Sequence, residues 1–336
     1  VALWLDSVLV LIFLLFMMGA QSALFGPVKY GLMPQILSAE ELLGGNGLVE
    51  TGTFLAILLG TALGGILIGI DGWGRELVAL AVVCIALAGF ISSLAIPRIA
   101  AVEPDMRINW NLFSETWEIM TYARANRGVF MSILGISWFW FVGSIYLTQL
   151  PNFSLQYLGG NEQVVTLLLA LFSIGVGCGS LLCERLSGRH VDIGLVPFGA
   201  IGLAVFGLDL GFIPSLDATQ ELRGVTDWAG TSLAARVMLD IILLGMFGGF
   251  YIVPLYASVQ QRSDARHRCR IIAANNVLNA LLMVCAALLA IAVLGSGFAI
   301  TELFLLVAAL NVLITGYIFL REPEFIWRFV TWIKSR

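Results

Sequence analysis

Two ionisable side chains lie inside apolar segments of the sequence, where charge is expensive. Lys29 lies near the end of one apolar run, on the helical face that also carries Gln21 and Phe25. Glu50 falls in the next apolar run, one turn after Asn46. Ionisable groups in a membrane segment usually face a partner or a wet cavity. We predict that Lys29 and Glu50 face either each other or a ligand, and both interpretations stay open.

The stretch around these residues occurs twice in the chain. Segment 19–65 is echoed from Gly245 onward. The residue pairs that keep a nearly constant spacing are Pro27 with Pro254, Asn46 with Asn275, and Pro97 with Pro323. Repeats of several helices usually indicate a fold built by duplication.

The two copies share their scaffold residues but not their charges. Tyr256 stands where the first copy has Lys29, and Asn279 stands where it has Glu50. A cavity that recognises an asymmetric charged ligand needs charge on one wall only. The difference therefore favours ligand contact, while a structural pair between helices remains the alternative.

The composition is that of a membrane protein. Hydrophobic residues make up 59% of the 336 residues and charged residues 12%, with a mean hydropathy of +0.95. A helix needs about 20 apolar residues to cross a bilayer. Nine such runs are predicted, at residues 4–25, 47–70, 75–96, 128–150, 163–183, 191–213, 232–258, 271–294 and 298–320.

Basic residues divide unevenly between alternate connections. Only Arg75, Arg223 and Arg236 fall on one side, and all other Lys and Arg residues fall on the opposite side. The positive-inside rule assigns the basic side to the cytoplasm. We expect a multi-pass protein with a cytoplasmic C-terminus, and no disulfide.

The repeat also predicts the domain plan. Spans one to three match spans seven to nine, and spans four to six have no counterpart before Val1. The expected fold is an all-α membrane protein, N-terminally truncated from a twelve-helix 6+6 parallel repeat, which resembles the major facilitator plan. The expected parts are the last three helices of the first half (1–97), a central cytoplasmic loop with an interfacial helix (98–127), a six-helix second half (128–321), and an amphipathic cytoplasmic tail (322–336).

Four charged residues near span ends are candidates for gating. Arg236 and Asp240 are spaced to pair along one helix, either as a local salt bridge or as an extracytoplasmic gate. Arg185 and Arg189 belong to the sequence ERLSGRH at 184–190, which resembles the Asp-Arg-x-Gly-Arg-Arg loop of facilitator proteins. An ordinary basic loop is the alternative interpretation.

Other motifs argue against an enzyme. Neither His190 nor His267 has an Asp four residues further on, and the sequence has no serine triad or metal cluster. Glycines spaced four apart are expected to pack helices closely, not to bind a nucleotide, because no strand precedes them. These pairs are Gly60 with Gly64, Gly65 with Gly69, Gly175 with Gly179, and Gly245 with Gly249. We predict no cofactor, no metal and no nucleic-acid partner.

Several segments resemble lysophospholipid transporters of the major facilitator superfamily. They are FGPVKYG at 25–31, GNGLVETGTFLAILLGTALGG at 45–65, SWFW at 137–140 and GGFYIVPL at 248–255. Residues 179–203 and the tail EPEFIWRFVTW at 322–332 are similar to the transporter half of bacterial fusions with a 2-acylglycerophosphoethanolamine acyltransferase.

This resemblance implies that lysophosphatidylethanolamine-type lipids are moved across the bacterial inner membrane for reacylation on the cytoplasmic side. We expect the mechanism to be alternating access between the two halves. Lys29 would bind the lipid phosphate. The implied partners are the lysophospholipid, membrane lipids and an acyltransferase domain or protein. The alternatives are a facilitator that exports or carries another small molecule, and a membrane anchor for an acyltransferase.

The expected substrate-binding residues are Lys29, Glu50, Gln21, Asn279, Tyr256 and Trp138. Trp138 belongs to an aromatic cluster at 138–141 that either lines an acyl-chain groove or packs against lipid and neighbouring helices.

Overall fold

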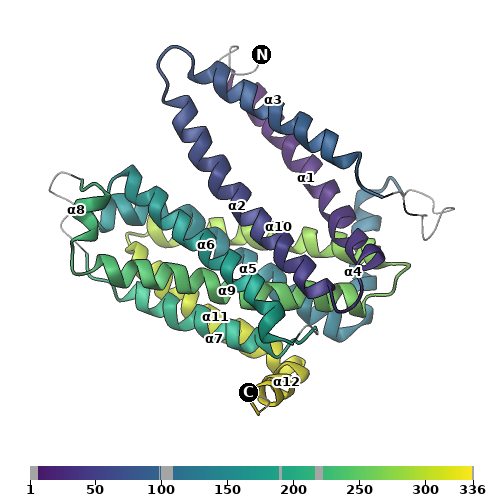
Figure 1. Ribbon diagram of the computed structural model, residues 1–336. Helices are drawn as coiled ribbons and strands as arrows, with labels where there is room; N and C mark the ends of the chain where they lie inside the picture. The colour runs from purple at the N-terminus through teal and green to yellow at the C-terminus, as the bar shows by residue number, and fades with distance from the viewer. Residues whose placement is uncertain (1–6, 98, 100–108, 189–190, 216–221, 335–336) are drawn as a thin grey trace.

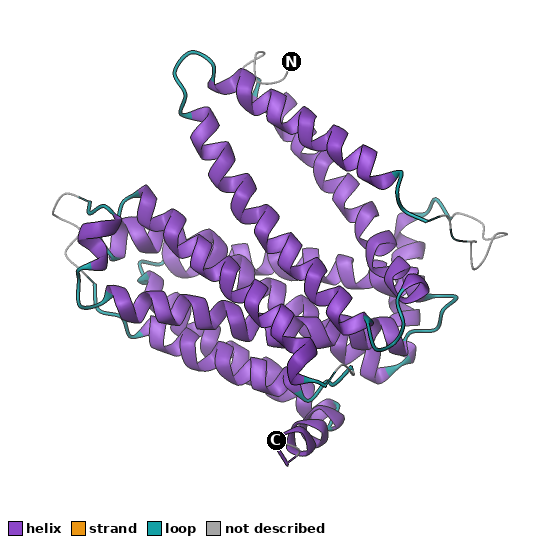
Figure 2. Ribbon diagram, in the orientation of Figure 1, coloured by secondary structure: helices purple, strands orange, loops and turns teal. Residues whose placement is uncertain are grey.

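The computed structural model describes residues 7–97, 99, 109–188, 191–215 and 222–334, which form helices and no strand (Figure 2). The helices are α1 (Val8–Ile36), α2 (Leu42–Ile68), α3 (Gly74–Ser93), α4 (Leu112–Ala125), α5 (Arg127–Asn152), α6 (Glu162–Leu186), α7 (Leu195–Gly211), α8 (Val225–Ala229), α9 (Ala234–Arg262), α10 (Arg268–Gly295), α11 (Ile300–Arg321) and α12 (Glu324–Lys334). One π-helical turn, η1 (Phe153–Tyr157), extends α5.

Each predicted span coincides with a helix. Eight helices of the described chain are long and apolar enough to cross a membrane, and the sixth predicted span is the shorter apolar helix α7. The all-α membrane fold is therefore confirmed.

The helices form two groups (Figure 1). Helices α5, α6, α7, α9, α10 and α11 pack into a bundle, here called the six-helix unit. Helices α1, α2 and α3, here called the arm, lean away from it at one end. The arm touches the unit near the end where α12 lies, mainly through α1 on α10 and through α2 on α6 and α9. In the sequence repeat, α1 corresponds to α9 and α2 to α10, so the α1–α10 and α2–α9 contacts are related by the repeat.

Glycines set the closest approaches inside the unit. A Cβ added to Gly249 would lie 2.5 Å from the backbone nitrogen of Ser180, and one added to Gly179 would collide with the carbonyl of Met246. The predicted packing role is confirmed for these two glycines. It is wrong for Gly60, Gly64 and Gly65, which have nothing within 4 Å of an added Cβ. This part of α2 lies in the arm, away from the six-helix unit (Figure 1).

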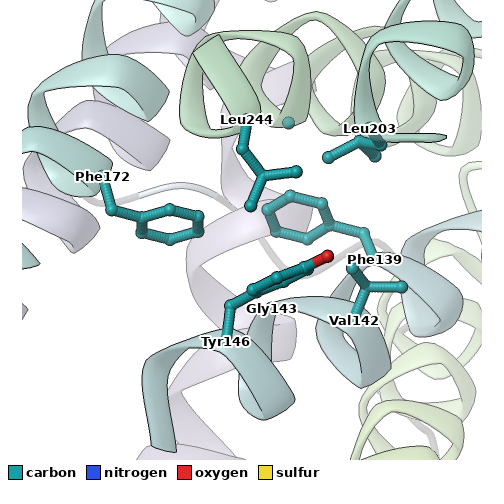
Figure 3. A pocket seen from close by; sticks show the side chains of 8 residues that line it. Phe139, Val142, Gly143, Tyr146, Phe172, Leu203 and Leu244 are labelled. Carbon is teal, nitrogen blue, oxygen red and sulfur yellow. The ribbon is translucent and has the colours of Figure 1, made fainter. Parts of the chain in front are cut away.

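The interior of the unit leaves little space. One enclosed cavity of about 10 Å³ lies among aromatic and aliphatic side chains that include Phe139, Tyr146 and Phe172 (Figure 3). A space of this size has room for about one water molecule. This cavity is therefore too small for a lipid.

Candidate functional site

A buried carboxylate lies where the arm meets the unit. Glu50 of α2 has no exposed surface, and its Oε1 accepts a hydrogen bond of 2.7 Å from the hydroxyl of Tyr30 of α1. Lys29 is half-buried, and its Nζ lies 4.5 Å from the centre of the Tyr30 ring. The structure thus gathers Lys29 and Glu50 around one tyrosine that joins α1 to α2.

The second copy of the repeat completes this group. Tyr256 of α9 stacks on Tyr30 with ring centres 4.3 Å apart and planes 3° apart. Its hydroxyl accepts a hydrogen bond of 3.3 Å from the indole Nε1 of Trp140, and the Trp140 ring stacks against Phe54 of α2. Tyr256, which stands opposite Lys29 in the repeat, therefore contacts the same tyrosine ring as Lys29.

The side-chain amides of Gln260 and Asn46 join this group on the side toward α12. The Nε2 of Gln260 donates to the carbonyl oxygen of Tyr30 at 3.0 Å, and the Nδ2 of Asn46 donates to the Oε1 of Gln260. These bonds tie α1, α2 and α9 together. We call Lys29, Tyr30, Asn46, Glu50, Tyr256 and Gln260 the polar cluster.

Parts of the polar cluster lack a protein partner. The Oε2 of Glu50 and the Oδ1 of Asn46 are buried and accept no hydrogen bond from a protein group among the described residues. Buried polar atoms are nearly always paired with protein, water or ligand. The cluster can therefore accept further donors, such as an ammonium group or water.

Three members of the polar cluster, Tyr30, Asn46 and Gln260, are not among the binding residues expected from the sequence. Tyr30 is next to Lys29, and Gln260 follows Tyr256 by four residues on the same helical face. The helical spacing could have indicated Gln260, because it lies one turn after Tyr256 on the same face. However, no charge or motif marks Gln260 in the sequence.

Three of the expected binding residues lie outside the polar cluster. Gln21 is exposed, two turns from Lys29 along α1. Asn279 accepts a 2.7 Å hydrogen bond from the Ser137 hydroxyl, within the six-helix unit. The indole of Trp138 donates to Asn311 at 2.9 Å, so it points toward α11. Residues two apart lie on nearly opposite sides of a helix. Trp140, and not Trp138, is therefore the tryptophan that contacts the polar cluster, through Tyr256.

The expected gating residues are also separated. Arg236 of α9 pairs with Asp209 of α7 through both carboxylate oxygens, with a distance of 2.9 Å between Nε and Oδ2. The partner is thus Asp209 and not Asp240, which lies buried one turn further along α9. This ion pair joins two helices of the same unit. Arg185 is exposed near the end of α6, and Arg189 lies outside the described residues.

A large apolar cavity lies between the arm and the unit, on the far side of Phe54 from α12. Its volume is about 770 Å³, and α2, α5 and α6 line it. Most lining residues are aliphatic, including Ile57, Leu147 and Leu169, with Glu162 as the acidic member. The aromatic contact of Phe54 with Phe172 stands between this cavity and the polar cluster.

These features define a multi-pass helical membrane protein with a polar site between two repeat-related helix groups. The chain belongs to the Major Facilitator Superfamily, whose model matches residues 1–226.

Two relatives of the chain share one name. It is 31% identical over 252 residues to the lysophospholipid transporter LplT of Escherichia coli O7:K1 (strain IAI39 / ExPEC), a match that covers 73% of this chain and 57% of that protein. The protein of the same name from Shigella dysenteriae serotype 1 (strain Sd197) is also 31% identical, with the same coverage. The chain thus spans 57% of the length of these curated relatives.

Proposed function

We propose that this chain is part of a transporter that moves lysophospholipids across a membrane. The observation that carries the proposal is the polar cluster, which places Lys29 and the buried Glu50 between two repeat-related helix groups. The names of the relatives, lysophospholipid transporter LplT, supply the substrate class.

The polar cluster fits the head of a lysophosphatidylethanolamine. Such a head carries an anionic phosphate and a cationic ammonium. Lys29 can bind the phosphate through a charge-assisted hydrogen bond, which is stronger than a neutral one. The unpaired Oε2 of Glu50 can accept from the ammonium. These contacts would replace the water that the head loses, since polar groups are costly to bury without partners.

The apolar cavity fits the single acyl chain. Its volume of about 770 Å³ lies within the range of roughly 300–1,000 Å³ that is typical of small-molecule sites. It begins one turn after Phe54 along α2, so a lipid whose head is near Glu50 can extend its tail toward Ile57. Thr148 and Thr166, which also line the cavity, leave it amphipathic at its edge.

The proposed mechanism is alternating access. Contacts between the arm and the unit concentrate near the α12 end, while the opposite ends of the arm stand apart from the unit (Figure 1). Rocking of one group against the other would expose the polar cluster to each side in turn, as in other transporters built from repeats. The basic residues assign the α12 end to the cytoplasm, and we place the protein in the bacterial inner membrane, where a cytoplasmic acyltransferase would reacylate the product.

The experiment is uptake of lysophosphatidylethanolamine by spheroplasts that express the protein with Lys29→Ala. Loss of one hydrogen bond to a charged group costs about 1.5–3 kcal/mol, so uptake should fall roughly 10- to 100-fold. Lys29→Arg keeps the charge and should retain part of the uptake. Gln21→Ala is the matched control, because Gln21 lies on the same helix but outside the polar cluster, and it should transport normally.

Three results would reject the proposal. Normal uptake by a folded Lys29→Ala protein would remove Lys29 from the binding site. Competition of uptake by sugars or drugs, but not by lysolipid, would assign a different substrate. Reconstituted liposomes without any lipid movement would favour a membrane anchor instead.

A further inference from the structure

Helix α4 exposes a row of aromatic side chains. Phe113 and Trp117 are 91% and 73% exposed, and their spacing of four residues places them on one face of α4. Trp110, just before α4 begins, is 84% exposed. The opposite face packs on α10 and α5, where Ile119 is buried. Such an aromatic row is unfavourable in water and is typical of helices that lie at a membrane surface.

Helix α12 has the same design at the same end of the molecule (Figure 1). Its Trp327 is 73% exposed and Ile333 is 52% exposed. On its inner face Phe325 is buried, and the indole of Trp332 donates to the carbonyl oxygen of Leu186 at 2.8 Å. We call α4 and α12 the interfacial pair.

The acidic residues of the interfacial pair turn inward. On α4, Glu118 accepts from the Nη1 of Arg270 at 3.0 Å, and Glu115 lies 3.7 Å from the same guanidinium. On α12, Glu324 receives both terminal nitrogens of Arg262, each at 2.7 Å. Arg262 is the last residue of α9 and Arg270 lies in the first turn of α10, so the two arginines flank one short loop. Each helix of the pair is thus fastened to one side of the α9–α10 hairpin.

Because these acids are paired, the outer charges of the two helices are mainly basic. Arg124 and Arg127 are exposed at the end of α4 and at the start of α5, and Lys334 is exposed on α12. Arg328 of α12 is also exposed, although its Nε lies 3.4 Å from the Oε1 of Glu324. Basic residues beside exposed aromatic ones fit a surface of anionic lipid headgroups, which attracts nearby Lys and Arg.

We propose that the interfacial pair is a docking surface for anionic membrane lipids and that it holds the α9–α10 hairpin at a fixed depth in the leaflet. The hairpin contains Tyr256 and Gln260 of the polar cluster. Binding of anionic lipid at this surface would therefore also fix the depth of the polar cluster in the membrane. The surface does not depend on which molecule the protein carries.

The test places a fluorescent bimane label on a single cysteine in the purified chain, with the five native cysteines replaced. The labelled variants are Trp117→Cys, Trp327→Cys and, as the matched control, Asp264→Cys in the exposed loop between Arg262 and Arg270. Proteoliposomes contain phosphatidylethanolamine and phosphatidylglycerol with a nitroxide near the top of the acyl chain. We expect several-fold stronger quenching at 117 and 327 than at 264, and weaker quenching when phosphatidylcholine replaces phosphatidylglycerol.

Three outcomes would overturn the proposal. Equal quenching at all three positions would place the interfacial pair in water. Quenching of 117 and 327 by aqueous iodide, but not by the lipid nitroxide, would indicate a surface for a soluble protein. Quenching that does not depend on phosphatidylglycerol, either with Arg328 and Lys334 present or in an Arg328→Gln/Lys334→Gln variant, would exclude a role for anionic lipid in docking. Unchanged gel-filtration elution of each labelled variant ensures that only folded protein is compared.

Discussion

The two copies of the sequence repeat have different surroundings. In the most apolar window of α9, 67% of residues are buried, whereas none are buried in that of the equivalent helix α1. Helix α9 lies between α6 and α7 in the six-helix unit, while α1 meets the rest of the chain mainly through α10. The comparison shows that the repeat specifies a helix and its proline, but the neighbouring helices determine whether its faces are buried.

The largest expected effect tests this contrast at the glycine that begins each copy. Gly245 of α9 faces the backbone of α6, where an added Cβ would collide with the carbonyl of Phe172, and Gly19 of α1 has nothing within 4 Å. Gly245→Ala should therefore destabilise the protein by about 1–3 kcal/mol through overpacking. Gly19→Ala should be neutral or stabilise it by up to about 1 kcal/mol, because Ala is the better helix former.

Thermal unfolding in detergent measures both variants. A thiol-reactive dye reports exposure of the buried Cys183 in a background where the four exposed cysteines are replaced by serine. The unfolding temperature should fall for Gly245→Ala only. Equal changes in unfolding temperature for the two variants would mean that the two copies are packed alike, which would contradict the difference between α1 and α9.

The next effect concerns the charges that distinguish the copies. Glu50→Gln keeps an acceptor for Tyr30 but removes the charge, and it should lower lysolipid uptake about tenfold, since a hydrogen bond to a charged group is worth about 1.5–3 kcal/mol. Asn279→Ala removes a neutral bond to Ser137, worth about 1 kcal/mol, and should cost only a few-fold. Uptake at equal protein level is the measurement. If both variants lose the same activity, the charge on the first copy has no special role.

The sequence predicted what depends on local pattern. Hydrophobic runs located the apolar helices of the described chain, and charge inside such runs marked Lys29 and Glu50. It could not predict which of Trp138 and Trp140 faces that boundary, because the answer depends on the rotation of α5 in the bundle. The Arg236 partner was missed for a similar reason, since Asp209 lies on a different helix and no spacing rule connects them. Gln260 carries no charge that would mark it.

The ends of α1 and α9 differ in a way that pH should reveal. Arg262 in α9 stands where the first copy has Gln35. Arg262 holds Glu324 of α12, whereas the Nε2 of Gln35 donates to the carbonyl oxygen of Gly31 in its own helix at 3.1 Å. Hydrogen bonding to Arg262 lowers the pKa of Glu324, with the nearby Arg262 and Arg328 charges acting in the same direction.

A carboxyl group whose pKa is lower in the folded state stabilises that state above its unfolded pKa, and this contribution disappears as the pH falls through the folded pKa. The contribution of Glu324 should thus be complete at pH 7 and fade below about pH 4. The Arg262–Glu324 pair is partly exposed, so we expect it to stabilise the protein by no more than about 1 kcal/mol.

The unfolding temperature of the wild type should exceed that of Glu324→Gln at pH 7, and the two should converge in acid. Gln35→Ala, the matched change in the first copy, should show a difference from wild type that does not vary with pH. A Glu324→Gln difference that persists unchanged in acid would mean that α12 is held by Phe325 and Trp332 alone, and that the two helix ends do not differ in this respect.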